Sequence, residues 1–328
     1  MSDAAFAEGQ PSAIPNDGRG AVVTVGTFDG VHLGHRAVLD VIRTRASAAD
    51  RRGVLLTFHP HPLRVIRPEV APALLTPPDE KKEALAATGL DYAVFLRFTR
   101  ALSRYSPSRF VEEILVDRLG VRELIVGHDH GFGRGRSGDV GTLRELGRSL
   151  GFDVDVVAPV VAGDRAVSSS RIRRAVSEGD LQSARSDLGR PYSLRGLVTQ
   201  GEGRGADLGF PTANLELPDP NKLLPPEGIY AVRGVLRRGT FDGALHLGPR
   251  PTFPRSRSTV EVHLMEFDAD IYGEAMRVDL IRFLRPVQAF ESGRALVRQM
   301  ELDVAEAKAA LEEDASIHDG VVPADSTK

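Results

Sequence analysis

Short apolar runs and helix-like periodicity alternate through the first half of the chain. Runs rich in Val, Leu, Ile and Phe predict five buried strands, at 21–25, 53–58, 92–98, 123–127 and 152–157. Apolar residues spaced three and four apart predict helices between them, at about 34–49, 81–88 and 107–119. Strands that alternate with helices form right-handed βαβ units and a parallel sheet. The pattern therefore predicts an α/β domain.

From Ser193 onward the pattern changes to short alternating strands separated by glycine and proline. No helical pattern returns until Gln288–Leu311, which is typical of an amphipathic helix. Many short strands with turn residues between them indicate an antiparallel barrel. We therefore predict an α/β domain over 20–189, followed by a β-barrel domain with a closing helix over 190–312.

Neither end of the chain carries a clear structural pattern. Residues 1–19 lack the basic start and apolar centre of a secretory signal, so we expect a flexible leader. Residues 313–328 are predicted to be a disordered tail. The change of pattern near residue 189 also predicts that a fragment from about Ser183 folds without the N-terminal half.

The composition narrows the functional classes. The 328 residues carry 42 basic and 45 acidic side chains, a net charge of −3, which argues against a nucleic-acid partner. There is no cysteine, so disulfides, thiolate nucleophiles and cysteine metal sites are excluded. No apolar run reaches the length of a membrane span. We expect a cytoplasmic protein with small-molecule partners and no membrane partner, whose oligomeric state the sequence does not tell.

The first candidate site lies in Val22–Leu39, where a strand meets a tight loop and then a helix. The loop runs into H-L-G-H, with His32 and His35 at the helix start. A helix start offers unpaired N–H groups and the positive end of the dipole, which favour phosphate. Two imidazoles three residues apart can donate to the same phosphoryl oxygens. For an isolated H-x-G-H, two ordinary polar histidines are an equally good interpretation.

Further candidates lie at the ends of later strands. The strand at 53–58 ends in H-P-H-P (59–62), at the sheet edge where α/β proteins bind ligands. Gly127–Asp139 interleaves glycines with Arg134 and Arg136, which suits a loop close to an anion. Ser168–Arg174 opens a helix with serines and arginines that can hold phosphate oxygens. Taken alone, each is also compatible with an ordinary loop or a solvated helix face.

The barrel half has its own candidate site in Gly201–Asn214. Four glycines, at 201, 203, 205 and 209, allow backbone amides to wrap ATP phosphates. Thr212 and Asn214 point to one side of an extended chain, where their oxygens suit Mg²⁺. In V-E-V-H-L (260–264), Glu261 lies on a strand face and is a candidate general base. A capped turn and a solvated strand face are the alternative interpretations.

These motifs, in this order, resemble those of the prokaryotic bifunctional riboflavin kinase/FAD synthetases over roughly residues 20–312. G-T-F-D-G-V-H-L-G-H (26–35) is similar to the adenylyltransferase signature, and S-S-S-R-I-R (168–173) to S-S-T-R-I-R. G-F-P-T-A-N-L (209–215) resembles the riboflavin kinase signature, with E-V-H-L, D-x-Y-G and F-L-R-P downstream. The resemblance implies a Rossmann-like nucleotidyltransferase domain before a riboflavin kinase barrel.

The resemblance also implies roles for single residues. His32, His35 and Glu261 would be catalytic, and Thr212 and Asn214 would bind Mg²⁺. Nucleotide and phosphate contacts would come from Gly26, Phe28, Asp29, Gly34, Ser169, Ser170, Arg171, Gly201, Gly203, Arg204, Gly205 and Gly209. The adenylyltransferase loops on the flavin side would contribute His61, Asp129, Phe132 and Gly133. His130 and Gly131 depart from the family pattern, and this leaves the flavin-side contacts of their loop open.

The implied activity has two steps, each with Mg²⁺ and ATP and neither with a covalent intermediate. The barrel would phosphorylate riboflavin to FMN, and the N-terminal domain would adenylylate FMN to FAD with release of pyrophosphate. Two alternatives stay open: a riboflavin kinase with a decayed adenylyltransferase module, and a flavin-binding sensor or store without turnover. A second G-T-F-D-G (239–243) has no H-x-G-H after it, and we predict a β-turn at Asp242-Gly243.

Overall fold

The chain divides into two compact units. A computed structural model describes residues 5–8, 14–15, 17–127, 139–162, 165–201, 205, 209–249 and 259–319. The first unit is Met1–Ser170 and the second is Arg171–Lys328. In the described part of the chain, no helix is both long and apolar enough to cross a membrane.

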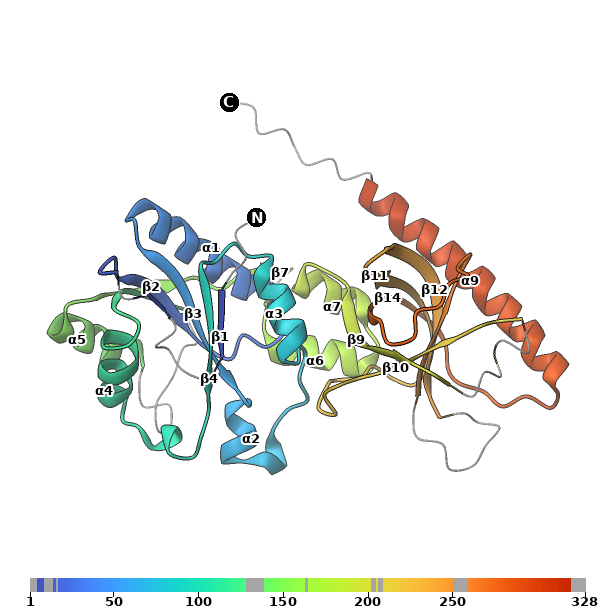
Figure 1. The fold of residues 1–328 in the computed structure, drawn as a ribbon, viewed down its shortest axis with the longest axis horizontal. Helices are drawn as coiled ribbons and strands as arrows, with labels where there is room; N and C mark the ends of the chain where they lie inside the picture. Colours follow the sequence, from blue (N-terminus) through green and yellow to red (C-terminus); the bar gives the residue numbers. More distant parts are fainter. Residues whose placement is uncertain are drawn as a thin grey trace. The chain divides into compact units, whose positions relative to one another are not determined.

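The N-terminal unit is built on a parallel sheet, as predicted (Figure 1). Its strand order is β1-β4-β3-β2-β5-β6. The strands are β1 (Ala5–Glu8), β2 (Ala21–Val25), β3 (Arg52–His59), β4 (Tyr92–Arg97), β5 (Val121–Gly127) and β6 (Asp153–Val157). β3 and β4 lie on one side of β2, and β5 and β6 lie on its other side. The strand order therefore reverses at the boundary between β2 and β5 in the sheet. Open α/β sheets bind ligands at such a point, beyond the carboxyl ends of the strands.

Helices cover both faces of this sheet. They are α1 (Leu33–Ala48), α2 (Pro62–Ile66), α3 (Pro78–Ala86), α4 (Pro107–Phe110) and α5 (Val140–Leu150). Side chains of α1 and α3 pack in one apolar layer, and those of α4 and α5 in a second one. The helix predicted over 107–119 is a single α-turn followed by a π-helix, η4 (Val111–Val116). Three short elements complete the set: η2 (Pro68–Val70), η3 (Leu102–Arg104) and a hairpin of β7 (Val161–Ala162) with β8 (Arg165–Ala166).

The leader predicted over residues 1–19 is wrong for part of that stretch. Ala5–Glu8 adds a parallel strand along Tyr92–Phe95 of β4. Ile14 is buried in the core, and Asp17 forms ion pairs with Arg19 and Arg52. The backbone of β4 offers the hydrogen bonds that a short added strand needs, and nothing local in the leader's sequence indicates this.

The C-terminal unit contains the predicted antiparallel barrel. Six strands close in the order β10-β13-β12-β11-β14-β9 (Figure 1). They are β9 (Tyr192–Thr199), β10 (Ala213–Glu216), β11 (Gly228–Leu236), β12 (Gly239–Gly248), β13 (Thr259–Leu264) and β14 (Ala275–Arg285). Closure leaves no unpaired sheet edge and fills the interior with alternate apolar side chains.

The β-turn predicted at Asp242-Gly243 is wrong. Both residues lie inside β12, and the turn between β11 and β12 is made by Arg237 and Arg238. Asp242 pairs in register with Arg233 on β11, with 3.5 Å between Arg233 Nε and the carboxylate. A Cβ on Gly243 would lie 2.5 Å from the His263 carbonyl oxygen, so glycine here permits close strand packing.

The closing helix is longer than predicted at its C-terminal end. α9 runs over Gly293–Asp319, so the tail prediction is wrong for residues 313–319. Leu311 packs beside Ala231 of β11, and Asp314 accepts hydrogen bonds from Arg185 and Arg233. Burial alone would raise the pKa of Asp314, but the hydrogen bonds and the positive charges of Arg233 and Arg185 together outweigh burial and lower it. The barrel therefore holds the last turns of the helix in place.

Two helices precede the barrel: α6 (Ser169–Glu178) and α7 (Leu181–Leu188). The sequence predicts both within the N-terminal domain, but residues 171–189 belong to the same compact unit as the barrel. α7 packs on β9 and β14, with Leu181, Ala184 and Leu188 buried. The predicted domain limit at residue 189 stays a prediction, and the packing of α7 bears on where a folded fragment should begin.

We predict that a fragment of residues 171–328 folds alone and makes FMN but no FAD. A fragment of residues 190–328 should be far less stable, because it lacks α7. Each of the two buried leucines of α7, Leu181 and Leu188, contributes about 1.5–3 kcal/mol by burial, and this contribution is lost. That loss of about 3–6 kcal/mol is a large part of a typical stability. Urea unfolding of both fragments measures the difference. Equal midpoints would show that α7 does not support the barrel.

Candidate active sites

The loop between β2 and α1 lies at the carboxyl end of the sheet, beside the crossover. Phe28 and Val31 adopt positive φ angles of 45° and 42° there, and Gly30 has a φ of 91°. A positive φ is rare for a bulky residue and for a β-branched one, and such strain is concentrated at functional sites. Phe28 and Val31 are both buried, so the surrounding structure fixes this conformation. The loop is therefore a rigid edge for a ligand.

The structure brings His32 and His35 together, as their spacing predicts. Their rings stack with centroids 3.6 Å apart, and the Phe28 ring lies 4.5 Å from that of His35. His32 caps α1, since its Nδ1 accepts a hydrogen bond from the His35 backbone N–H at 3.3 Å. An accepting Nδ1 places the proton of a neutral His32 on Nε2. His32 Nε2 is then a hydrogen-bond donor at the mouth of the helix.

The start of α6 lies close to this loop, with contacts at Gly34 and Ser169. A Cβ on Gly34 would lie 3.3 Å from the His32 ring and 3.7 Å from the Val167 carbonyl oxygen. Ser169 Oγ donates to the Asp29 carbonyl oxygen at 2.8 Å. Ser170 follows on an exposed position. The predicted grouping of the histidines with Ser169 therefore agrees with the geometry of the N-terminal unit.

Arg171 is held by a carboxylate that the sequence did not indicate. Its Nε lies 3.0 Å from Oδ2 of Asp187 on α7, whose side chain is 1% exposed. Burial raises the pKa of Asp187, and the charge of Arg171 opposes that rise. The pair fixes one edge of the guanidinium and thereby orients Arg171.

Asp29, predicted among the nucleotide contacts, holds the loop itself. The residue is 1% exposed, and its carboxylate accepts hydrogen bonds from Leu75 N (3.1 Å), Thr76 N (2.9 Å) and Thr76 Oγ1 (3.2 Å). Gly26 enters the same loop, and its N–H donates to the Leu56 carbonyl. Thr76 was not predicted, because it lies 47 residues from Asp29 with no motif between them.

Of the residues predicted on the flavin side, the structure describes only His61. His61 caps α2, and its Nδ1 accepts from Leu63 N at 3.2 Å. Asp129, Phe132 and Gly133 lie outside the described residues, as do His130 and Gly131. These residues stay predictions.

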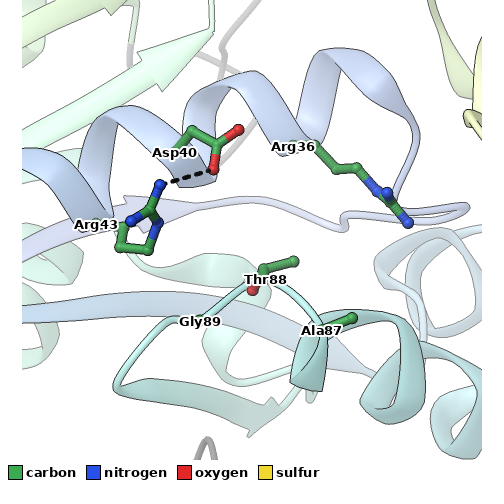
Figure 2. A pocket seen from close by; sticks show the side chains of 6 residues that line it. All are labelled: Arg36, Asp40, Arg43, Ala87, Thr88 and Gly89. Atoms are coloured by element: carbon green, nitrogen blue, oxygen red, sulfur yellow. Dashed lines mark ion pairs between the residues drawn. The ribbon is translucent and has the colours of Figure 1, made fainter. Parts of the chain in front are cut away.

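A hollow of about 410 Å³ lies between α1 and the residues that follow α3 (Figure 2). Arg36, Asp40 and Arg43 line it from α1, and Ala87, Thr88 and Gly89 line it from the end of α3. Arg43 and Asp40 form an exposed ion pair at 3.6 Å. No predicted site residue lines this hollow, although Arg36 directly follows His35.

In the C-terminal unit, Gly201 lies against Asn214, and Gly205 lies against Thr212. A Cβ on Gly201 would overlap the Asn214 side-chain amide. A Cβ on Gly205 would overlap the Phe210 carbonyl and lie 3.1 Å from Thr212 Oγ1. Gly209 has a φ of 86°, a conformation that favours glycine. Gly203 and Arg204 lie outside the described residues.

Strand register places Glu261 beside Asn214. The two residues are direct partners across β10 and β13, and His246 on β12 is the partner of Glu261 on its other side. Directly opposed side chains share a sheet face, with Cβ atoms about 5 Å apart. Glu261 Oε1 accepts a hydrogen bond from Thr259 Oγ1 at 2.9 Å. Sequence reasoning missed Thr259 and His246, although both lie on strands that alternate.

The donor set in this unit suits Mg²⁺ bound together with ATP. Thr212 and Asn214 offer a hydroxyl and an amide oxygen, hard ligands that leave room for phosphate and water. Among the described residues, no cluster of three or more His, Cys, Asp or Glu side chains could hold a metal by itself. A metal at Thr212 and Asn214 would therefore need the nucleotide's phosphates to complete its shell.

Comparisons with known proteins agree with this two-site arrangement. Residues 14–171 match the FAD synthetase family model, and residues 188–311 match the riboflavin kinase family model. The bifunctional riboflavin kinase/FMN adenylyltransferase of Escherichia coli K12 is 36% identical, over 87% of this chain and 90% of that protein. The protein of the same name from Listeria monocytogenes is also 36% identical, over 88% of this chain and 91% of that protein.

A crystal structure of a macrolide-efflux protein from Streptococcus pneumoniae has a similar fold. Its TM-score is 0.80 at 26% identity, over 92% of this chain and 98% of that one. The two family models match in sequence, and relatives 36% identical align along about nine-tenths of their own length. The chain therefore belongs to the family of bifunctional riboflavin kinase/FMN adenylyltransferases.

Proposed function

We propose that the barrel transfers the γ-phosphoryl group of ATP to riboflavin, and that the N-terminal unit joins the resulting FMN to AMP from a second ATP. The products are FMN and ADP from the first step, and FAD and pyrophosphate from the second. The observation that carries this proposal is that each unit has its own candidate phosphate site, in the order of the two family models.

In the kinase step, Glu261 is the general base for the attacking riboflavin hydroxyl. Its place beside Asn214 puts a carboxylate next to the proposed Mg²⁺ ligands. Mg²⁺, when bound, supplies positive charge that offsets the charge of the transferring phosphoryl group. The backbone amides of the 201–209 stretch would bind the ATP phosphates, with Arg204 beside them.

In the adenylyl step, His32 and His35 donate hydrogen bonds to the α-phosphoryl group as negative charge develops on it. Gly26, Phe28 and Gly34 form the backbone surface that the nucleotide approaches, and Asp29 keeps that surface in shape. The leaving pyrophosphate is held by Ser169, Ser170 and Arg171, at the N-terminal end of α6. No covalent intermediate is needed, because positioning and charge stabilisation suffice.

The test is the intact protein incubated with riboflavin and Mg-ATP, with the flavins separated by chromatography over time. We expect FMN to appear first and FAD to follow, with one pyrophosphate released per FAD. Chelation of Mg²⁺ should stop both steps, and added Mg²⁺ should restore them. FMN alone would indicate a kinase with an inactive adenylyltransferase module. Unchanged riboflavin would indicate a flavin-binding protein without turnover.

A further inference from the structure

Lys81 is a buried cation attached to the β2–α1 loop. It lies on α3, the residue is 7% exposed, and its Nζ donates a hydrogen bond to the Thr27 carbonyl oxygen at 2.7 Å. Thr57 Oγ1, from the end of β3, donates to the same carbonyl at 3.0 Å. One backbone oxygen of the loop therefore takes one charged donor and one neutral donor.

The segment that carries Lys81 is tied to the loop at other points as well. Asp29 accepts from Leu75 and Thr76, and the Gly30 N–H donates to Thr76 Oγ1 at 2.8 Å. The loop contains the strained residues Phe28 and Val31, and strained backbone persists only where the surroundings over-determine it. The contacts from residues 75–81 therefore help to keep the loop in one conformation.

The charge of Lys81 distinguishes it from the second donor to the Thr27 carbonyl oxygen. Thr57 shows that a neutral hydroxyl can donate to the Thr27 carbonyl. A hydrogen bond from a charged donor is stronger than one from a neutral donor, so Lys81 ties the Thr27 carbonyl more firmly than a hydroxyl would. Lysine binds phosphate as a compact point charge with three donors. The loop that Lys81 contacts leads directly into His32 and His35.

We propose that Lys81 is a positioning residue of the adenylyl-transfer site, a role that rests on the proposed function of the N-terminal unit. Through Thr27 its ammonium holds the loop in the conformation that receives ATP, and its positive charge favours binding of the triphosphate. The sequence offers a signal for it in retrospect. Lys81 precedes buried Leu85 by four residues, which places it on the inward face of α3.

The test compares Lys81→Gln and Lys81→Arg in the intact protein, with FMN supplied and ATP varied. Lys81→Gln keeps a donor but removes the charge, and we expect the KM for ATP to rise at least about tenfold. Lys81→Arg keeps the charge and should stay within about threefold of wild type. Riboflavin phosphorylation, measured in the same samples, should be unchanged and reports that the chain is folded.

Two matched variants separate charge from support. Lys82→Gln removes the neighbouring charge, whose Nζ lies 3.8 Å from the Asp79 carboxylate, and should leave the KM for ATP unchanged. Thr57→Val removes the neutral donor to Thr27 and should affect the KM for ATP much less than Lys81→Gln does. Thermal unfolding of each variant identifies any that lose the fold. If Lys81→Gln is one of these, the KM for ATP of the Lys81→Arg enzyme is compared with that of wild type instead.

The outcomes are distinct. A Lys81→Gln enzyme with the wild-type KM for ATP would overturn the proposal. Equal effects of Thr57→Val and Lys81→Gln would overturn it too, because support without charge would then explain both. A wild-type protein that makes FMN but no FAD would instead overturn the proposed adenylyltransferase function, and this inference with it.

Discussion

A His35→Ala enzyme is expected to form FAD from supplied FMN about 10²–10³-fold more slowly than wild type. The substitution removes a ring donor that stacks on His32 at 3.6 Å, while the His35 backbone N–H that caps the helix remains. Loss of one well-placed donor to developing charge typically costs about 2.7–4 kcal/mol of transition-state stabilisation. The measurement is kcat for FMN adenylylation at saturating ATP, with pyrophosphate release as the readout.

Two controls accompany the His35 variant. His59→Ala removes an exposed histidine at the end of β3 and should leave FAD formation unchanged. Riboflavin phosphorylation should be the same in all three proteins, because its proposed residues lie in the other unit. If FMN formation fell in parallel with FAD formation, the assignment of the two reactions to separate sites would be wrong.

The architecture of both units could be predicted because burial leaves a direct trace in the sequence. β2 is buried on both faces, and four of its five residues are apolar (Ala21, Val22, Val23 and Val25, with a buried Thr24 between them), which is typical of the centre of a parallel sheet. β13 alternates Val260, Val262 and Leu264 with polar residues, as a barrel strand with one inner face does. Local periodicity was sufficient in both cases.

The elements that were predicted wrongly or missed depend on contacts between residues distant in the sequence, or begin within a loop motif. The last turns of α9 are ordered because Asp314 meets Arg185, 129 residues earlier, and polar residues in a tail carry no sign of such a partner. The leader's strand depends on the edge of β4, far along the chain. α5 follows a glycine-rich stretch, and the loop motif that contains its N-cap Asp139 hides the start of the helix.

The residues of the candidate sites also fall into two groups: those whose neighbours follow from local spacing and those whose neighbours depend on the fold. The spacing of His32 and His35 on one helix turn sufficed to predict that their rings meet. The neighbour relation of Asn214 and Glu261 depends on the register between β10 and β13, which no local pattern specifies. Asp29 has both a motif position and a structural role, and only the folded structure reveals Leu75 and Thr76 as its partners.

Glu261→Gln is expected to lower kcat for riboflavin phosphorylation by about 10²–10⁴, the usual contribution of a general base. Glutamine has the same size, and its carbonyl oxygen can still accept the hydrogen bond from Thr259 Oγ1, so the strand pairing should be kept. It cannot take the proton of the attacking hydroxyl. The KM for ATP should change little, because the lost interaction belongs to the transition state.

The control for this variant is Glu216→Gln, which removes an exposed carboxylate from β10, opposite Leu197 of β9. It carries the same change of charge within the same barrel, so any effect of net charge or of strand stability would appear in both variants. Adenylylation of supplied FMN should continue at the wild-type rate in both. A Glu261→Gln enzyme with wild-type kcat would remove Glu261 from the role of base. Proton transfer would then have to depend on another group on the same sheet face, and His246, the cross-strand partner of Glu261, would be the next residue to replace.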